Sequence, residues 1–297
     1  MRIAITGASG LIGAALSRRL KEDGHDVVPV VRRAPGDNEI GWSVADNRID
    51  DGAFDGIDAV VHLAGAGIGD HRWTDAYKRE ILESRTVGTA LVANAITAAT
   101  DGPKVLLSSS AIGYYGESTD ATFDEQSPVG TGFLAEVCEA WEMAAAPATT
   151  DEVRVAFLRT GIVLSAEGGA LKKQLPLFKF GLGGKMGSGN QWQSWIHIDD
   201  EVAAIVHLLT SAVGGPVNLT APNPVTNAEF TDTLGDVLGR PTFLPIPKFG
   251  PKLVLGGELA DNLLFSGQKV VPTVLEQDGF TFSHPTLDGA LRDLLKQ

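Results

Sequence analysis

The sequence predicts an α/β protein in which helices cover both faces of a mainly parallel sheet, followed by a smaller α/β unit at the C-terminal end. Three observations predict this class. Short apolar runs alternate with helical patterns as far as Arg159, and a glycine-rich turn joins the first run to the first helical pattern. Beyond Arg159 the chain becomes rich in glycine, lysine and proline. Regular alternation of this kind is typical of a doubly wound parallel sheet.

The individual elements follow in chain order. Apolar runs predict strands at residues 2–6, 26–31, 58–63, 104–108 and 153–159. Apolar residues at helical spacing predict helices at residues 11–23, 75–99 and 133–146. In the last third, residues 227–238 and 286–295 form amphipathic helical patterns, and Thr226 with Glu229 forms a capping pair before the first of them.

Charge and composition argue against several classes of partner. The chain has 24 Lys and Arg against 37 Asp and Glu, a net charge of −13, which repels nucleic acids and anionic membrane surfaces at long range. No run approaches the ~18 apolar residues of a membrane span. Met1 leads into an apolar run without a signal-peptide pattern, and the single cysteine, Cys138, cannot form an intramolecular disulfide. We therefore expect a cytoplasmic protein with neither nucleic acid nor membrane as a partner.

The turn after the first predicted strand carries the strongest functional pattern. Gly7, Gly10 and Gly13 are spaced by three residues in the segment that also contains Ser9, Leu11 and Ile12. The first glycine permits a tight turn, the second lets backbone amides approach a pyrophosphate, and the third lets the helix pack closely on the strand. Because the pattern follows a strand and opens a helix, it predicts a Rossmann-type dinucleotide site. A purely structural turn is the alternative.

The end of the second predicted strand indicates which dinucleotide is bound. A site that prefers NAD(H) usually offers an acidic residue there, whereas this chain has Arg32 and Arg33. A guanidinium pairs with the 2′-phosphate of NADP(H), and it acts within the ~8 Å screening length despite the negative net charge. We expect NADP(H) to be preferred, with NAD(H) possible. The alternative is that both arginines are solvated loop charges.

With these features, the sequence resembles the extended short-chain dehydrogenase/reductase superfamily, the NAD(P)-dependent epimerase/dehydratase group. The likeness lies in residues 6–13, 61–65, 108–116, 158–159 and 195–200. Residues 84–89, 133–138 and the stretch from Pro224 are similar to the uncharacterised subgroup called epimerase family protein, which has its own C-terminal domain of unknown function. The resemblance implies that Leu63, Ala64, Gly65 and Ser108 border the cofactor. Arg85 replaces the asparagine of the superfamily's Asn-x-x-Gly-Thr segment, and it is expected to face the cofactor or an anionic substrate, or else to form a helix-surface ion pair.

The resemblance also implies a division of the chain. Residues 1–220 are expected to form the NADP-binding domain, and residues 221–297 a smaller domain that covers the substrate. The segment 161–195 is expected to contribute to the substrate side, because lysines and glycines between Lys172 and Gly189 suit an anionic ligand. A flexible surface loop is an equally good interpretation of that segment.

The catalytic pattern of the superfamily is incomplete in this chain. Its substrate-polarising serine is matched by Ser110, with Ser109 beside it. Phe133 and Val137 occupy the positions of the Tyr-x-x-x-Lys pair, and neither side chain transfers a proton. Tyr114, Tyr115 and Glu136 are the candidates to transfer the proton in place of the missing tyrosine. Alternatively, Tyr115 forms a wall of the pocket and Glu136 faces water or pairs with an arginine. Cys138 is interpreted as a small core residue.

Two functions remain open at this point. The first is an NADP(H)-dependent oxidoreductase or epimerase acting on an unidentified small carbonyl, alcohol or nucleotide-sugar-like substrate. The second is a catalytically inactive NADP(H)-binding sensor or regulatory protein, and a structural module with an empty cleft ranks far behind both. A monomer or homodimer is expected, no metal site is predicted, and His62, His197 and Asp199 are given structural roles.

Overall fold

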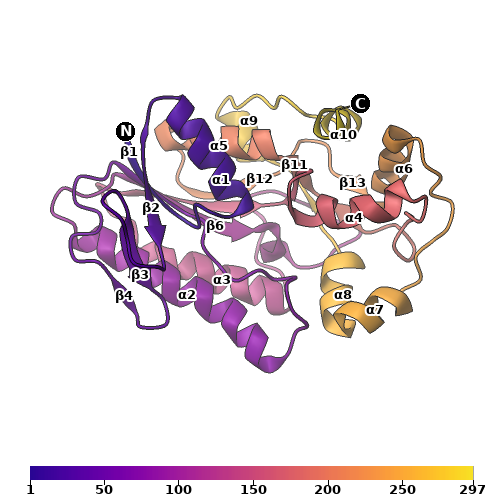
Figure 1. Cartoon of the computed structure of the whole chain (residues 1–297), viewed down its shortest axis with the longest axis horizontal. Coiled ribbons are helices and arrows are strands. Elements are labelled where there is room, and N and C mark those ends of the chain that lie inside the picture. The colour runs from indigo at the N-terminus through magenta and orange to yellow at the C-terminus, as the bar shows by residue number, and fades with distance from the viewer. Residues whose placement is uncertain (297) are drawn as a thin grey trace.

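One eight-stranded sheet forms the centre of the protein. The computed structural model (Figure 1) describes residues 1–296. The strands of the sheet lie in the order β12-β8-β6-β5-β1-β2-β3-β4. All pairs are parallel except β3 with β4. The strand bounds are β1 (Arg2–Thr6), β2 (Asp26–Val31), β3 (Ile40–Ser43), β4 (Arg48–Ile49), β5 (Ala59–His62), β6 (Val105–Ala111), β8 (Arg154–Thr160) and β12 (Gly215–Leu219). The predicted Rossmann-type sheet is confirmed.

Helices cover the two faces of this sheet in pairs. Helices α1 (Leu11–Glu22) and α5 (Ile198–Thr210) pack on one face, and α2 (Asp75–Ala98) and α3 (Phe133–Ala145) lie on the other (Figure 1). Strand β1 shows why: Ile3 and Ile5 belong to the core beneath α1 and α5, whereas Ala4 belongs to the core beneath α2. Alternation of side chains along a strand thus supplies apolar groups to both layers.

A smaller third core lies at the end of the molecule where the C-terminal segment folds. It contains Leu171, Trp195, Phe230, Leu234 and Leu291. Helices α4 (Gly169–Lys179), α6 (Asn227–Leu238) and α10 (Leu287–Leu295) contribute to this core. The C-terminal segment also forms α7 (Phe249–Leu255), α8 (Gly257–Leu264) and α9 (Thr273–Gln277). Three short strand pairs join the segments, namely β9 (Ile162–Leu164) with β11 (Trp195–His197), β10 (Trp192–Gln193) with β13 (Val225–Thr226), and β7 (Thr122–Phe123) with β14 (Lys269–Val270).

The C-terminal segment is not confined to this end. The β7–β14 pair connects it to the loop after β6, and Leu275 of α9 lies in the core beneath α1 and α5. Two 3₁₀ turns, Ile112–Tyr115 and Ala146–Ala148, follow β6 and α3. Within residues 1–296, no helix combines the length and the apolar composition needed to cross a bilayer.

Most predicted elements lie within a few residues of the observed ones. The helix predicted at residues 227–238 has the bounds of α6, and both hydrogen bonds of the Thr226–Glu229 capping box are present. The sequence patterns missed the edge strands β3, β4 and β12 and the helices α4, α7, α8 and α9.

Candidate functional site

The turn between β1 and α1 has the geometry of a dinucleotide site. Gly7 has a φ of +68°, and a Cβ at Gly13 would lie 2.2 Å from the Gly7 carbonyl oxygen, so the helix packs against the turn at a distance that only glycine allows. Gly10 is the N-cap residue of α1, and no side chain caps the helix. Ser9 and Gly10 are exposed, and Leu11 and Ile12 are half-buried. The first amides of α1 are therefore open to an anion such as pyrophosphate.

A buried network holds the loop after β5 against this turn. The Thr6 hydroxyl accepts hydrogen bonds from the amides of Leu63 (3.0 Å) and Ala64 (3.1 Å) and lies 2.8 Å from His62 Nδ1. Because this hydroxyl oxygen already accepts from two amides, we assign its own proton to His62 Nδ1, which places the ring proton on Nε2, 2.9 Å from the Thr89 hydroxyl. Burial lowers the pKa of His62 to about 4, so the ring is neutral and structural. Leu63 and Ala64 thereby border Gly7.

The two arginines after β2 differ in their surroundings. Arg33 forms a bidentate ion pair with Glu39, at 2.6 and 2.7 Å, and donates to the Ala34 carbonyl. Arg32 is exposed and has no hydrogen-bond or ion-pair partner within residues 1–296. Of the two guanidinium groups, that of Arg32 is thus available to a phosphate.

Arg85 is buried and lacks a counter-ion in the described part of the chain. It projects from α2, is 8% exposed, donates from Nη1 to the Ile81 carbonyl at 3.0 Å and lies 4.8 Å from the Trp141 ring. A Cβ at Gly65 would be 3.3 Å from its Cζ, so the guanidinium lies directly against the loop after β5. Burial lowers the pKa of Arg85. Its Nε and Nη2 atoms have no partner within residues 1–296, a costly arrangement for a buried cation.

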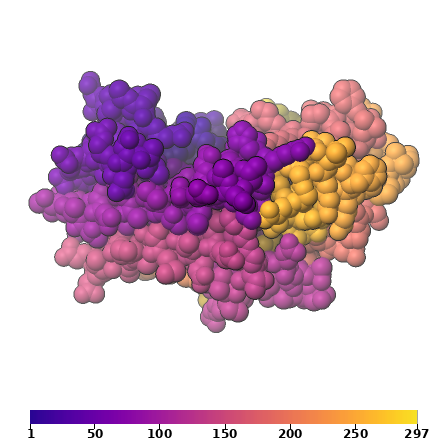
Figure 2. Space-filling model, turned by 90° about the horizontal axis from the view of Figure 1, so that it is seen from below, coloured from indigo at the N-terminus to yellow at the C-terminus, as the bar shows by residue number. Residues whose placement is uncertain are grey.

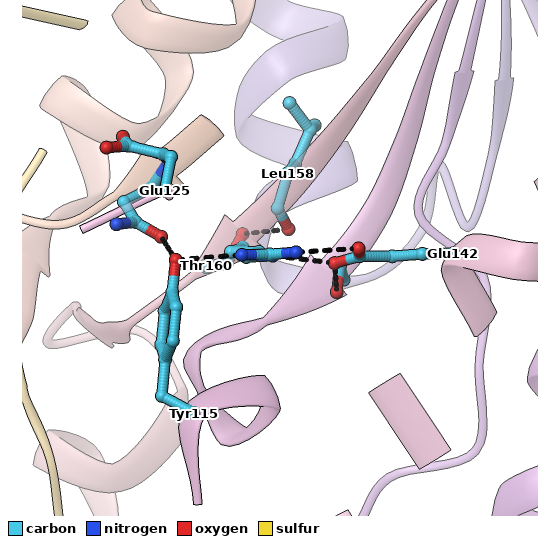
Figure 3. A network of polar contacts seen from close by, with 8 residues as sticks. Tyr115, Glu125, Glu142, Leu158 and Thr160 are labelled. Atoms are coloured by element: carbon cyan, nitrogen blue, oxygen red, sulfur yellow. Dashed lines mark hydrogen bonds and ion pairs between the residues drawn. The ribbon is translucent and has the colours of Figure 1, made fainter. Parts of the chain in front are cut away.

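The end of β6 carries a second polar network, built around Arg159 of β8 (Figure 3). Ser110 Oγ donates to Glu142 Oε1 at 2.7 Å, and Arg159 donates to both oxygens of Glu142 at 2.8 and 2.9 Å. On its other side, Arg159 donates to the Tyr115 hydroxyl at 3.0 Å, and that hydroxyl donates to Asn218 at 2.7 Å. Glu142 and Asn218 were not predicted for the site.

The predicted proton carriers are not equivalent in this arrangement. Tyr115 is buried, its hydroxyl proton is held by Asn218, and burial raises its pKa to about 12. The Tyr114 ring stacks on the Arg159 guanidinium, whose Cζ is 3.5 Å from the ring centroid. Glu136 is exposed on the solvent side of α3. Ser109 is half-buried, and the buried Ser108 hydroxyl has no hydrogen-bond partner within residues 1–296.

Phe133 and Val137, which occupy the positions of the missing tyrosine and lysine, make apolar contacts. Phe133 packs edge-on against Trp73, with ring centroids 5.1 Å apart, and Val137 is buried beside Tyr77 and Ile81. Cys138, the next residue, is also buried, and burial raises the pKa of its thiol to about 12. The start of α3 therefore presents apolar side chains and a buried thiol, and Glu136, its carboxylate, is exposed.

A cluster of His197, Asp199, His284 and Asp293 lies away from this network. His197 is the N-cap of α5, and its Nδ1 accepts a hydrogen bond from the Asp199 amide at 3.0 Å, so the His197 side chain caps this helix. The rings of His197 and His284 are stacked with centroids 3.8 Å apart. Imidazole binds metals in its ring plane, so two nearly parallel rings do not converge on one ion.

Known proteins resemble this chain over nearly its whole length. Residues 3–220 match the NAD dependent epimerase/dehydratase family, and residues 246–294 match a domain of unknown function, DUF1731. An epimerase family protein of Mycobacterium tuberculosis is 44% identical over 97% of this chain and 96% of the relative. The human epimerase family protein SDR39U1 is 39% identical over 99% of this chain and 100% of its own length. A crystal structure of human SDR39U1 (isoform 2) with NADPH has a TM-score of 0.92 at 37% identity, covering 100% of both chains. The chain belongs to the NAD dependent epimerase/dehydratase family.

Proposed function

We propose that the protein is an NADP(H)-dependent oxidoreductase or epimerase that acts on a small carbonyl or alcohol without the Tyr-x-x-x-Lys pair. Two features together carry this proposal. The N-terminus of α1 at Gly10 has no side-chain cap, and Ser110 at the end of β6 donates a hydrogen bond to Glu142 of α3. The NADPH in the human relative's structure supports the choice of cofactor.

The residues that would hold the cofactor follow from the geometry. The amides of Leu11, Ile12 and Gly13 at the start of α1 would bind the pyrophosphate, and Arg32 would pair with the 2′-phosphate. The further border would come from Ser9, Leu63, Ala64, Gly65 and Ser108. Bound NADP(H) would supply or accept a hydride. A carboxylate at Arg32 would repel the 2′-phosphate, so the free guanidinium favours NADP(H) over NAD(H).

The proton would be handled by Ser110 and Glu142 in place of the missing tyrosine. When a substrate alcohol is oxidised, its hydroxyl proton would pass to Ser110 Oγ while the proton of Ser110 passes to Glu142 Oε1. Carbonyl reduction would use the reverse transfer. Arg159 fixes the orientation of the carboxylate through two hydrogen bonds, and positioned acid-base groups of this kind contribute ~10²–10⁴-fold to rate.

Arg85 would supply the anion specificity of the site. Its unpaired N–H groups lie against Gly65 at the predicted cofactor border, where a carboxylate or phosphate of the substrate would compensate the buried charge. We therefore propose that the substrate carries an anionic group next to its carbonyl or alcohol.

Deuterium transfer provides the test of the oxidoreductase proposal. The protein is incubated with NADPH deuterated at the transferable position and with pairs of carbonyl compounds, each pair comprising an anionic compound and its uncharged analogue. Deuterium should appear in reduced products of anionic compounds and fall at least about 100-fold in Ser110→Ala, as expected for loss of a general acid-base group. Glu139→Gln, at an exposed position of the same helix, serves as the control. NADPH binding without transfer to any compound would contradict an enzyme of this class.

A catalytically inactive NADP(H) sensor is the second candidate. Phe133 and Val137 favour it, because both replace proton-transfer groups by packed apolar side chains. In that case calorimetry would show tight NADPH binding without transfer, and a pull-down would recover different partners with and without NADPH.

A further inference from the structure

The acidic net charge of the chain is distributed unevenly. Residues 168–198 and 237–257 contain none of the 37 acidic residues but seven of the 24 basic ones, namely Lys172, Lys173, Lys179, Lys185, Arg240, Lys248 and Lys252. Of these, Lys252 pairs with Asp261 at 2.7 Å. The two segments therefore contribute seven basic side chains and no carboxylate of their own to a chain of charge −13.

The same two segments hold most of the exposed apolar side chains. Ten large apolar side chains are exposed within residues 1–296, and eight of them lie in these segments: Leu177, Phe180, Leu182, Phe243, Leu244, Phe249, Leu253 and Val254. Phe180 is 81% exposed and Leu253 is 77% exposed. Helix α7 buries none of its residues. Apolar exposure gathered in this way marks an interaction surface rather than ordinary scatter.

Backbone contacts join the segments into one surface, here called the basic-apolar face. The Ile246 amide donates to the Lys185 carbonyl at 2.9 Å, and the Gly187 amide donates to the Ile246 carbonyl at 3.0 Å. Figure 1 shows α4 and α7 at the same end of the molecule, and in Figure 2 the segment containing α7 and α8 forms a continuous orange surface beside the segment around residue 75. There Arg72 donates to the carbonyls of Leu253 and Val254.

We propose that the basic-apolar face docks on the surface of an anionic lipid bilayer, with its apolar side chains inserted at the level of the headgroups. Phenylalanine and leucine side chains that project from the surface, with lysines among them, suit an interface that is apolar below and negatively charged above. Lysine stems can lie along the apolar layer while their ammonium groups reach the phosphates.

Charge argues against a second copy as the occupant. A two-fold interface places the same patch on both sides, so it would bring lysines against lysines without an acidic residue from either segment to compensate them.

The expectation that the chain avoids anionic membranes rested on its net charge, whereas a local field is set by nearby charges because salt screens the others beyond about 8 Å.

Vesicle co-sedimentation of the full chain tests this proposal. Vesicles of phosphatidylcholine alone are compared with vesicles containing phosphatidylglycerol, at low and high salt. We expect binding to the anionic vesicles, weakened by salt and at least about tenfold weaker in the double variant Phe249→Ser with Leu253→Ser, because apolar area is lost from the interface. Lys179→Gln with Lys185→Gln should lower binding by at least about tenfold, since each lysine near an anionic surface contributes.

Two controls separate docking from general effects. Met143 is exposed to 69% outside both segments, so Met143→Ser should bind vesicles as the unchanged protein does, and Lys21→Gln is the matched charge control. Circular dichroism and NADPH calorimetry check that each variant folds. Failure to bind anionic vesicles, equal binding to neutral ones, or a concentration-dependent dimer abolished by the Phe249 and Leu253 double variant would each overturn the proposal.

Discussion

Ser110 Oγ lies 2.7 Å from Glu142 Oε1 and donates its proton to that carboxylate, which Arg159 holds with two further hydrogen bonds. The side chains of Arg159 and Glu142 are only 4% and 11% exposed. This enclosed carboxylate compensates a buried cation, and it accepts a hydrogen bond from Ser110, the serine of the proposed proton transfer. Stability and proposed chemistry therefore depend on the same side chain.

Removing the carboxylate of Glu142 should destabilise the protein strongly. Glu142→Ala leaves Arg159 buried without a counter-charge, so the free energy of unfolding should fall by about 3–5 kcal/mol. Urea unfolding measures the change. Glu136→Ala, on the exposed side of the same helix, should change stability by no more than about 0.5 kcal/mol. Equal effects of the two substitutions would show that the Arg159 pair contributes nothing specific.

Substitutions of two glycines in the first turn should have different effects: Gly13→Ala should lower stability, and Gly10→Ala should lower the affinity for NADPH. Gly13→Ala places a Cβ 2.2 Å from the Gly7 carbonyl oxygen, so it should cost about 1–3 kcal/mol of stability or more through overpacking. Gly10→Ala meets that oxygen at 3.3 Å and keeps an ordinary φ of −75°. It should fold but bind NADPH at least about tenfold more weakly, because the methyl group obstructs the pyrophosphate. Urea unfolding and calorimetry on both variants check this, and a fully stable Gly13→Ala would refute the packing argument.

Arg32 and Arg33 should differ in their contribution to cofactor choice. Arg32→Ala should weaken NADPH binding about 10- to 100-fold, as expected for a charge-assisted contact, and leave NADH binding nearly unchanged. Arg33→Ala should have the smaller effect because Glu39 already holds that guanidinium at 2.6 Å. Calorimetry with both dinucleotides measures these affinities. A larger loss of NADPH affinity in Arg33→Ala than in Arg32→Ala would show that Arg33, and not Arg32, pairs with the 2′-phosphate.

The sequence predicted β1, β2, β5, β6 and β8 of the central sheet because each of them is a local apolar run bounded by turns. It did not predict β3 and β4, which are short edge strands, or α7, whose Pro251 and flanking glycines resemble a loop. The sequence predicted that the C-terminal segment is a smaller α/β unit. It did not predict that Leu275 of this segment lies in the core beneath α1 and α5, because that contact depends on long-range packing.

Glu142 was missed because its role depends on two registers that no local pattern reveals. Strand pairing places Ser110 opposite Arg159, and the phase of α3 turns Glu142 toward them while Glu136 faces water. That phase was readable in principle: Cys138, Trp141 and Ala145 are buried, and Glu142 is one turn after Cys138. The glycine turn, in contrast, was evident because its three glycines and its strand-helix context lie within eight residues.

Glu201 should make stability fall as the pH rises. It is fully buried at the start of α5, its Oε1 accepts from the Thr160 hydroxyl at 3.0 Å, and burial raises its pKa to about 8. In the unfolded chain a glutamate titrates near pH 4.3. Between these values the folded state holds a proton that the unfolded state has lost, so the free energy of unfolding should decrease by up to about 1.4 kcal/mol per pH unit.

The difference between the unchanged protein and Glu201→Gln isolates this group from other titrations. The amide cannot ionise, so the variant should lack the decline between about pH 4.3 and 8. Urea unfolding at a series of pH values measures both curves. Parallel curves across that range would show that Glu201 is already ionised in the folded state at neutral pH.

Arg85 should show opposite effects on stability and on ligand binding. Arg85→Met keeps the length of the side chain and its contact with Trp141 but removes a buried charge that has no counter-ion within residues 1–296. The free energy of unfolding should therefore rise by about 1–3 kcal/mol. Turnover of an anionic carbonyl compound should nevertheless fall about 10- to 100-fold through KM, while turnover of its uncharged analogue changes little. Arg85→Lys should recover only part of the loss, because an ammonium group cannot pair in the bidentate geometry of a guanidinium. Replacing a purely structural residue would lower the free energy of unfolding. If Arg85→Met lowers both this free energy and the turnover of the anionic compound, Arg85 contributes to the packing of α2 on α3 and not to recognition of an anion.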